Sequence, residues 1–375
     1  MFDAMAAADA LIEVYRRAYL EILRRIAERR AAGRSTAFDE ALMRDVGGIL
    51  SQLDATAEQW AWEAIPKAYG EGVREALAPF AAMRGGKALQ IAPGMIKAHQ
   101  HAVQILVDSL LDDLHDAHTF VGRRIRDQWR SAQLEAVLEK TATGQTMRQA
   151  QKALRESLAD EGLTAFRDSR GREWGLDSYA NMVVRSVTAE SQNAGLLMQL
   201  DGMGHDLVRM TEHRATCPIC SPYEGRVYSR TGQTEGYPRL TDVPGFDQGY
   251  ETLHPNCRHR IAPYVPEGDD DPDKTRTLSN RPFEDTRSAA DKEAYARQQE
   301  MGRLRRDRRK LEQQLVIMPA GAERDAIREK LREVRGEQQR MGRQEKQARL
   351  RMAAENRAYY AARDSGQAAS WPGRQ

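Results

Sequence analysis

Hydrophobic residues recur at helical spacing along the first third of the chain. Leu11, Tyr15, Ile22 and Ile26 follow one another at intervals that place them on one face of a helix. Similar apolar faces run through residues 42–53 and 96–114. The pattern predicts helices over residues 1–120. The expected breaks are Gly33-Arg34-Ser35, Pro66 with Gly70-Glu71-Gly72, and Ala92-Pro93-Gly94.

The middle of the chain mixes helix and strand signals. Thr146 and Gln149 form a capping-box pattern ahead of a helix that would end at Gly162. Residues 166–174 place turn residues between two aromatic ends, which predicts a small hairpin. Asp177 is the expected cap of a helix that continues to Gly202, and residues 206–211 form a short strand.

The last third of the chain returns to helical patterning. Apolar residues keep a heptad seam on either side of the turn Pro319-Ala320-Gly321, so residues 290–360 predict two long helices. These helices can form a helical hairpin or an oligomerising coiled coil. The acidic turn at residues 267–272 marks a boundary before them, and the tail from Asp364 is expected to be disordered.

These patterns predict an α+β fold that is predominantly helical. Three parts are expected along the chain: an N-terminal helical region (1–120), a core with short strands and a metal-binding loop (121–268), and a C-terminal helical arm with its tail (269–375). A chain of 375 residues is long enough for two or three such domains.

The charge, hydropathy and cysteine count argue against several classes of protein. The formal net charge is only +2, so any surface that binds nucleic acid must be local. No apolar run reaches the roughly 18 residues that a membrane helix needs, and the N-terminus lacks the order of a signal peptide. Three cysteines, an odd number, argue against a disulfide framework. We therefore expect a protein that folds in a reducing cytosol and contacts no membrane during assembly.

The candidate chemistry lies in residues 211–266, which are too rich in Gly and Pro to hold their shape by hydrophobic burial. Cys217-Pro-Ile-Cys220 and His254-Pro-Asn-Cys257 share one layout, a ligand, a proline, one residue and a second ligand. Two such turns supply the four tetrahedral ligands of a structural zinc site. The predicted ligands are Cys217, Cys220, His254 and Cys257.

Some details of that site stay open at the level of sequence. His213 or His259 can replace His254 as the fourth ligand, and each can equally be a hydrogen-bonded structural histidine. Three thiolates and one neutral imidazole leave a charge near −1 on the bound metal, so we expect flanking arginines to neutralise it. The candidates are Arg214, Arg226, Arg258 and Arg260.

Rival interpretations of the cysteines are weaker. Inert buried thiols would not explain two matched turns, and a redox pair would need a thioredoxin-like context. A catalytic zinc keeps an open position beside an acid or base; Glu212 and Glu224 lie nearby, but nothing marks either as a base. Elsewhere, the basic run at residues 303–310 could contact DNA phosphates, although a solvated helix face is the plainer interpretation.

Several stretches together resemble the phage minor capsid protein 2 family, which is related to the phage Mu protein F-like head morphogenesis proteins. The similarity runs through residues 144–146, 165–174, 178–185 and 206–213. It is strongest at residues 217–228 and 254–259, where related proteins often end the last motif in Cys and this chain has His259. The resemblance spans roughly residues 120–350; the N-terminal helices carry nothing that matches.

The resemblance implies a structural, non-enzymatic virion protein. It implies a few copies inside the phage head near the portal vertex, assembled in the host cytoplasm and acting in head assembly, DNA packaging or ejection. Expected partners are the portal protein and the capsid shell, with non-specific contact to packaged DNA and self-association through the arm. Two alternatives stay open: a zinc-dependent nuclease of the His-Asn-His type, and a nucleic-acid-binding zinc module with a coiled-coil arm.

Overall fold

A computed structural model describes most of the chain. The described residues are 3–31, 36–83, 95–142, 164–167, 173–213, 215–247, 252–266 and 271–364. The expected breaks at Gly33-Arg34-Ser35 and Ala92-Pro93-Gly94, the capping box at Thr146, the acidic turn and the tail lie wholly or mostly outside them. Within the described residues the fold is predominantly helical with short strands, as predicted.

The chain folds into two compact units. The first unit comprises residues 1–213 and 222–284, and the second comprises residues 214–221 and 285–375. Each is described by itself below. The three-part division that the sequence indicates stays a prediction.

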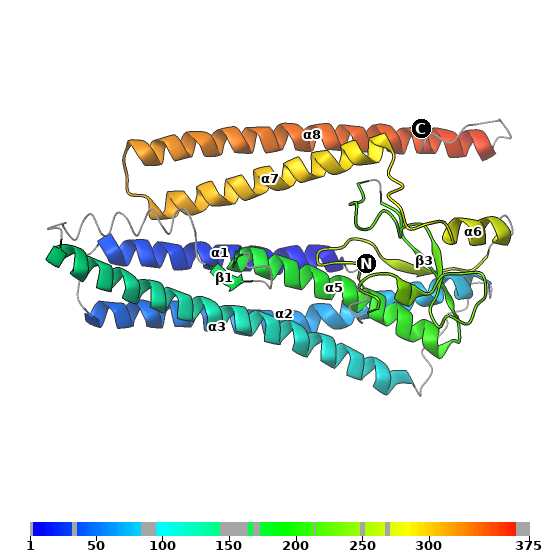
Figure 1. Cartoon of the computed structure of the whole chain (residues 1–375), viewed down its shortest axis with the longest axis horizontal. Helices are drawn as coiled ribbons and strands as arrows, with labels where there is room; N and C mark the ends of the chain where they lie inside the picture. Colours follow the sequence, from blue (N-terminus) through cyan, green and yellow to red (C-terminus); the bar gives the residue numbers. More distant parts are fainter. Residues whose placement is uncertain are drawn as a thin grey trace. The chain divides into compact units, whose positions relative to one another are not determined.

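Four helices form the body of the first unit. They are α1 (Ala4–Ala31), α2 (Thr36–Met83), α3 (Ile96–Ala142) and α5 (Leu176–Gly202). They run lengthwise beside one another (Figure 1), and α2 packs against each of the other three. The predicted apolar faces form their core, because Leu11, Tyr15, Leu53, Leu110 and Leu114 are all fully buried.

The helices α2 and α5 cross at unusually short range. A Cβ atom added at Gly72 would lie 1.8 Å from the carbonyl oxygen of Gln192, and one added at Gly195 would lie 2.2 Å from that of Tyr69. Only glycine lets two backbones approach so closely. Beside the crossing, the Gln192 side chain donates to Glu71 at 3.0 Å.

The structure corrects two sequence-based expectations in these helices. Pro66 and Gly70–Gly72 do not interrupt α2, which continues from Thr36 to Met83 with Pro66 and Pro79 inside it. A proline costs about 3 kcal/mol in a helix interior, but the neighbours Ile65 and Ala68 are fully buried and their packing offsets it. Asp177 is not the cap of α5 either, since the helix begins at Leu176 after Gly175, and Asp177 lies in its first turn.

Small β elements complete the first unit. The predicted hairpin is present as β1 (Thr164–Arg167) paired antiparallel with β2 (Glu173–Gly175). The predicted strand near residue 206 is β3 (Leu207–Met210), the centre of an antiparallel sheet in the order β4-β3-β5. Its neighbours are β4 (Val227–Ser229) and β5 (Ile261–Pro263), and the short helices η2 (Leu240–Asp242) and α6 (Pro272–Ser279) flank the sheet.

Asp206 fastens the loop that follows β4. Its carboxylate accepts hydrogen bonds from Ser229 Oγ at 2.5 Å, Thr234 Oγ1 at 2.5 Å, and the amide and hydroxyl of Thr231 at 2.8 and 2.7 Å. Burial alone would raise the pKa of Asp206, but these bonds hold that pKa below its usual range. The carboxylate therefore stabilises the fold while it is ionised.

The pH dependence of stability should reveal this bond network. Because the folded pKa of Asp206 is depressed, its stabilisation is present above about pH 4 and is lost as the pH falls toward the folded value. Asp206→Asn should remove about 2 kcal/mol at pH 7 and less at pH 3. Urea unfolding at several pH values between about 3 and 7 measures the loss of stability at each pH. The exposed Asp201→Asn is the control, and an equal loss in the two variants would contradict the assignment.

The second unit contains the predicted helical hairpin. It consists of α7 (Ala289–Ile317) and α8 (Ala322–Asp364), which run antiparallel beside each other (Figure 1). Ser288 and Asp291 form a capping box at the start of α7. Arg335 donates to Glu312 at 3.0 Å and Arg308 donates to Gln338 at 3.4 Å across the seam, which sets the register.

Candidate metal centre

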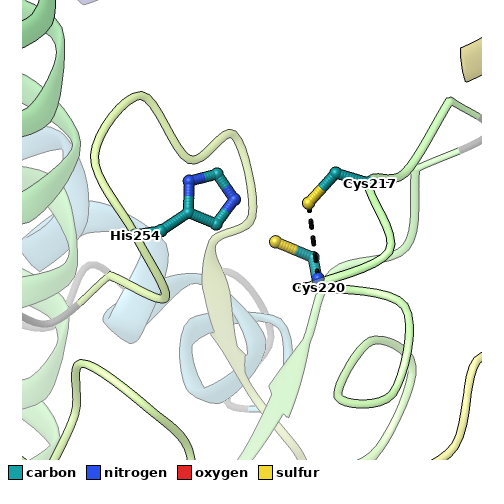
Figure 2. A group of neighbouring side chains, drawn as sticks. All are labelled: Cys217, Cys220 and His254. Carbon is teal, nitrogen blue, oxygen red and sulfur yellow. Dashed lines mark hydrogen bonds between the residues drawn. The ribbon is translucent and has the colours of Figure 1, made fainter. Parts of the chain in front are cut away.

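The turn Cys217-Pro-Ile-Cys220 is closed by hydrogen bonds of its own backbone. The Cys220 amide donates to Cys217 Sγ at 3.4 Å, the bond drawn in Figure 2, and the Ser221 amide donates to the Cys217 carbonyl at 3.0 Å. An amide donor at sulfur favours the thiolate, which is the form of cysteine that binds metals. Cys220 is buried and Cys217 is partly exposed.

Within the second unit, this turn is fixed to the start of the arm. Ser221 Oγ donates to Asp285 Oδ1 at 3.0 Å and accepts from the Thr286 amide at 3.0 Å. Thr286 Oγ1 donates to the Ser221 carbonyl at 3.2 Å, and Arg287 pairs with Asp285 at 2.8 Å. The cysteine turn and the cap of α7 are therefore one hydrogen-bonded structure.

The second turn, His254-Pro-Asn-Cys257, belongs to the first unit. The Cys257 amide donates to the His254 carbonyl at 3.0 Å, and Asn256 adopts a positive φ of 61°, a conformation that asparagine tolerates. His254 Nδ1 lies 2.8 Å from the Pro255 carbonyl and can donate to it. The tautomer that makes this bond leaves Nε2 as a ligand nitrogen.

His259 has the setting of a metal-binding or metal-supporting histidine. It is buried, its Nε2 lies 2.9 Å from Glu224 Oε2, and its Nδ1 lies 3.7 Å from Cys257 Sγ. Burial alone would lower the pKa of His259, but the bonds to Cys257 and Glu224 raise it to about 9. An imidazole binds a metal only in its neutral form, so metal binding by His259 would have to displace this proton.

The candidate ligands form two overlapping groups. Cys217, Cys220 and His254 make one (Figure 2), and Cys220, Cys257 and His259 make the other. In each group the ligand atoms lie within 4.8 Å of one another. Ligands of a tetrahedral zinc ion are separated by about 3.8 Å, and thiolates with imidazoles are the donor set that zinc prefers. The residues therefore fit a metal ion of this class.

His213 is in neither group. Its Nε2 lies 2.9 Å from the Arg258 carbonyl, its amide donates to Glu224 at 3.1 Å, and its ring packs edge-on against His259 at 4.6 Å. These contacts are those of a supporting histidine that holds Glu224 and the His259 ring in place.

The arginines near the site do not all have the role that the sequence indicates. Arg226 is buried and donates to the carbonyls of Ser279, Arg281 and Pro282, so it fastens β4 to the segment after α6. Arg260 pairs with Glu75 at 2.6 Å, and Arg214 lies outside the described residues. The pKa of Arg287 is raised, mainly by Asp285 and to a smaller extent by the Cys217 thiolate.

The supporting roles of two residues have no signal in the sequence. Glu224 looks like any other acidic residue of the loop, yet it orients His259 across 35 positions of the chain. Arg287 follows the metal turns by many residues and enters the neighbourhood of Cys217 through the cap of α7. Spacing places Glu224 near the cysteines but does not show its contact with His259, and it gives no connection to Arg287.

A comparison with models of protein families identifies a family that the chain resembles. The family model for phage minor capsid protein 2 matches residues 4–344, which include the N-terminal helices, both metal turns and most of the arm. Neither the curated proteins nor the solved structures gave a match. Among the described helices, none has the length and hydrophobicity of a membrane span. Because the family model covers most of the sequence, the chain belongs to the phage minor capsid protein 2 family.

Proposed function

We propose that this chain is a low-copy structural component of the phage head that lies near the portal vertex and aids head assembly and DNA packaging or ejection. The family match over residues 4–344 carries this proposal. The architecture supports it, because α2 and α3, with 48 and 47 residues, are each about 70 Å long and offer extended surfaces to partners. The proposed role is mechanical and not catalytic.

The proposed metal is a structural zinc ion bound by Cys217, Cys220, His254 and Cys257. Two observations support it: the backbone-closed cysteine turn, and the His254 ring whose Nδ1 faces a carbonyl. In this assignment Glu224 and His259 support the site from outside the ligand set. Zinc binding would add folding free energy to a segment that is rich in Gly and Pro and contains only short strands.

Quantitative mass spectrometry of gradient-purified virions tests the proposed location. A constant small number of copies per portal ring is the expected result, together with co-sedimentation of the purified chain with portal rings. Absence from mature particles would contradict a virion role. Nicking of plasmid DNA in added magnesium would then favour the nuclease alternative.

The choice between His254 and His259 can be decided by zinc content. His254→Ala should reduce bound zinc well below one per chain, whereas His259→Ala should keep one zinc at lower affinity, because it removes the contacts with Glu224 and Cys257 but no proposed ligand. Elemental analysis gives the stoichiometry, and the absorption of the cobalt-substituted protein reports the ligand set. His101→Ala, at an exposed position on α3, is the matched control. The reverse order of effects would make His259 the ligand.

A further inference from the structure

Charge is distributed unevenly between the two ends of the chain. Residues 285–375 contain 22 Lys and Arg residues against 14 Asp and Glu, a net charge of +8. The whole chain carries +2, so residues 1–284 carry −6. A nearly neutral protein therefore has a strongly basic arm, a local charge that the net charge of the whole chain does not reveal.

The excess positive charge is concentrated in one part of the hairpin. Residues 303–310 of α7 and 340–346 of α8 together contain nine basic and two acidic residues. The cross-seam bond from Arg308 to Gln338 brings these two stretches to the same level of the antiparallel pair (Figure 1). We call this surface the basic collar.

Some of the positive charge of the arm, including part of the collar, is neutralised by ion pairs within the helices. Arg303, for example, pairs with both Glu300 and Asp307, and Arg308 pairs with Glu312. Five basic side chains of the collar are exposed and make no ion pair with any residue in the described part of the chain. They are Arg305, Arg306, Arg340, Arg343 and Lys346.

We infer that the basic collar binds the phosphate backbone of double-stranded DNA without sequence preference. The cations of the arm are mostly arginine, 18 of 22, and the planar guanidinium matches phosphate with two parallel hydrogen bonds. The collar contains no aromatic side chain, so it lacks the stacking surface that single-stranded nucleic acid requires. Exposed cations that do not read base edges bind the phosphate backbone of DNA, and such contacts carry no sequence information.

Salt dependence of binding tests this inference on the full-length, zinc-loaded chain. Fluorescence anisotropy with a 30-base-pair duplex should give a logarithmic salt slope of about −4 to −5, since each neutralised phosphate contributes about −0.9. A variant with Arg305→Gln, Arg306→Gln, Arg340→Gln and Arg343→Gln should reduce that slope by about 3 to 4 units. Glutamine keeps the helix propensity, so helicity measured by circular dichroism should be unchanged.

A matched control removes the same number of charges from the other end of the hairpin. It carries Arg324→Gln, Arg328→Gln, Lys330→Gln and Arg332→Gln, and its slope should change by less than about one unit. Equal losses in both variants would overturn the collar as a site, as would no binding by the parent chain at low salt. Displacement of the duplex by polyglutamate at equal charge concentration would instead identify the partner as an acidic protein surface. The inference is independent of the head location proposed above.

Discussion

Gly72→Ala is expected to destabilise the first unit by about 3 kcal/mol, the upper range for overpacking a tight contact. The added methyl group would lie 1.8 Å from the Gln192 carbonyl oxygen, and that atom is backbone in the middle of α5. Relief therefore requires α2 and α5 to move apart, which opens the core beside Ile65 and Leu196. Urea unfolding monitored by circular dichroism measures the loss.

The same helix supplies the control. Gly47 lies in α2 at an exposed position, and a methyl group added there would meet no atom within 4 Å. Gly47→Ala should leave stability unchanged or raise it by up to about 1 kcal/mol, because alanine restricts the unfolded chain and favours the helix. Equal unfolding midpoints for the two variants would mean that α2 and α5 do not cross at Gly72.

Removal of zinc is expected to unfold the segment around the two metal turns. Zinc binding in small sites of this donor type contributes on the order of 10 kcal/mol. After chelation, amides of β4 and β5 should therefore exchange with solvent hydrogen many-fold faster. Hydrogen-exchange mass spectrometry measures this directly. The amides of α3, a long helix with its own packing, are the internal reference and should keep their protection.

Two results would contradict the zinc assignment. One is a purified chain that contains no zinc and shows the same exchange with and without chelator. The other is a Cys257→Ser variant that keeps both one zinc per chain and full protection of β5. Loss of protection in α3 as well would show a global effect and not a local role for the metal.

Helices with clear apolar faces could be predicted from the sequence, and so could the hairpin turn near Pro319. The failures have a common physical reason. Pro66 and Gly72 are local signals against helix, but α2 is held by packing against three other helices, which local rules do not weigh. Gly72 is in fact required by a long-range contact with Gln192. A glycine that locally disfavours helix is thus needed for the packing of α2 against α5.

The candidate ligands could be found from spacing because each pair lies within one short turn. The network around them could not, since it depends on residues brought together by folding. Glu224 reaches His259 from 35 positions away, and Ser221 reaches Asp285 from 64 positions away. Sequence spacing identifies the candidate ligands that share one turn. Only the structure identifies the carboxylate, serine or arginine that contacts them.

The contact between Ser221 and Asp285 also has a consequence for the order in which the protein is made. When the Cys217–Cys220 turn leaves the ribosome, the hydrogen bonds within the turn can form. The cap of α7, which also binds Ser221, is synthesised 64 residues later. At about 5 to 20 residues per second, the delay is several seconds. During that interval the turn lacks the hydrogen bonds that join Ser221 to Asp285 and Thr286. A nascent chain stopped before residue 285 would therefore contain the Cys217–Cys220 turn without the hydrogen bonds that hold Ser221 in the complete protein.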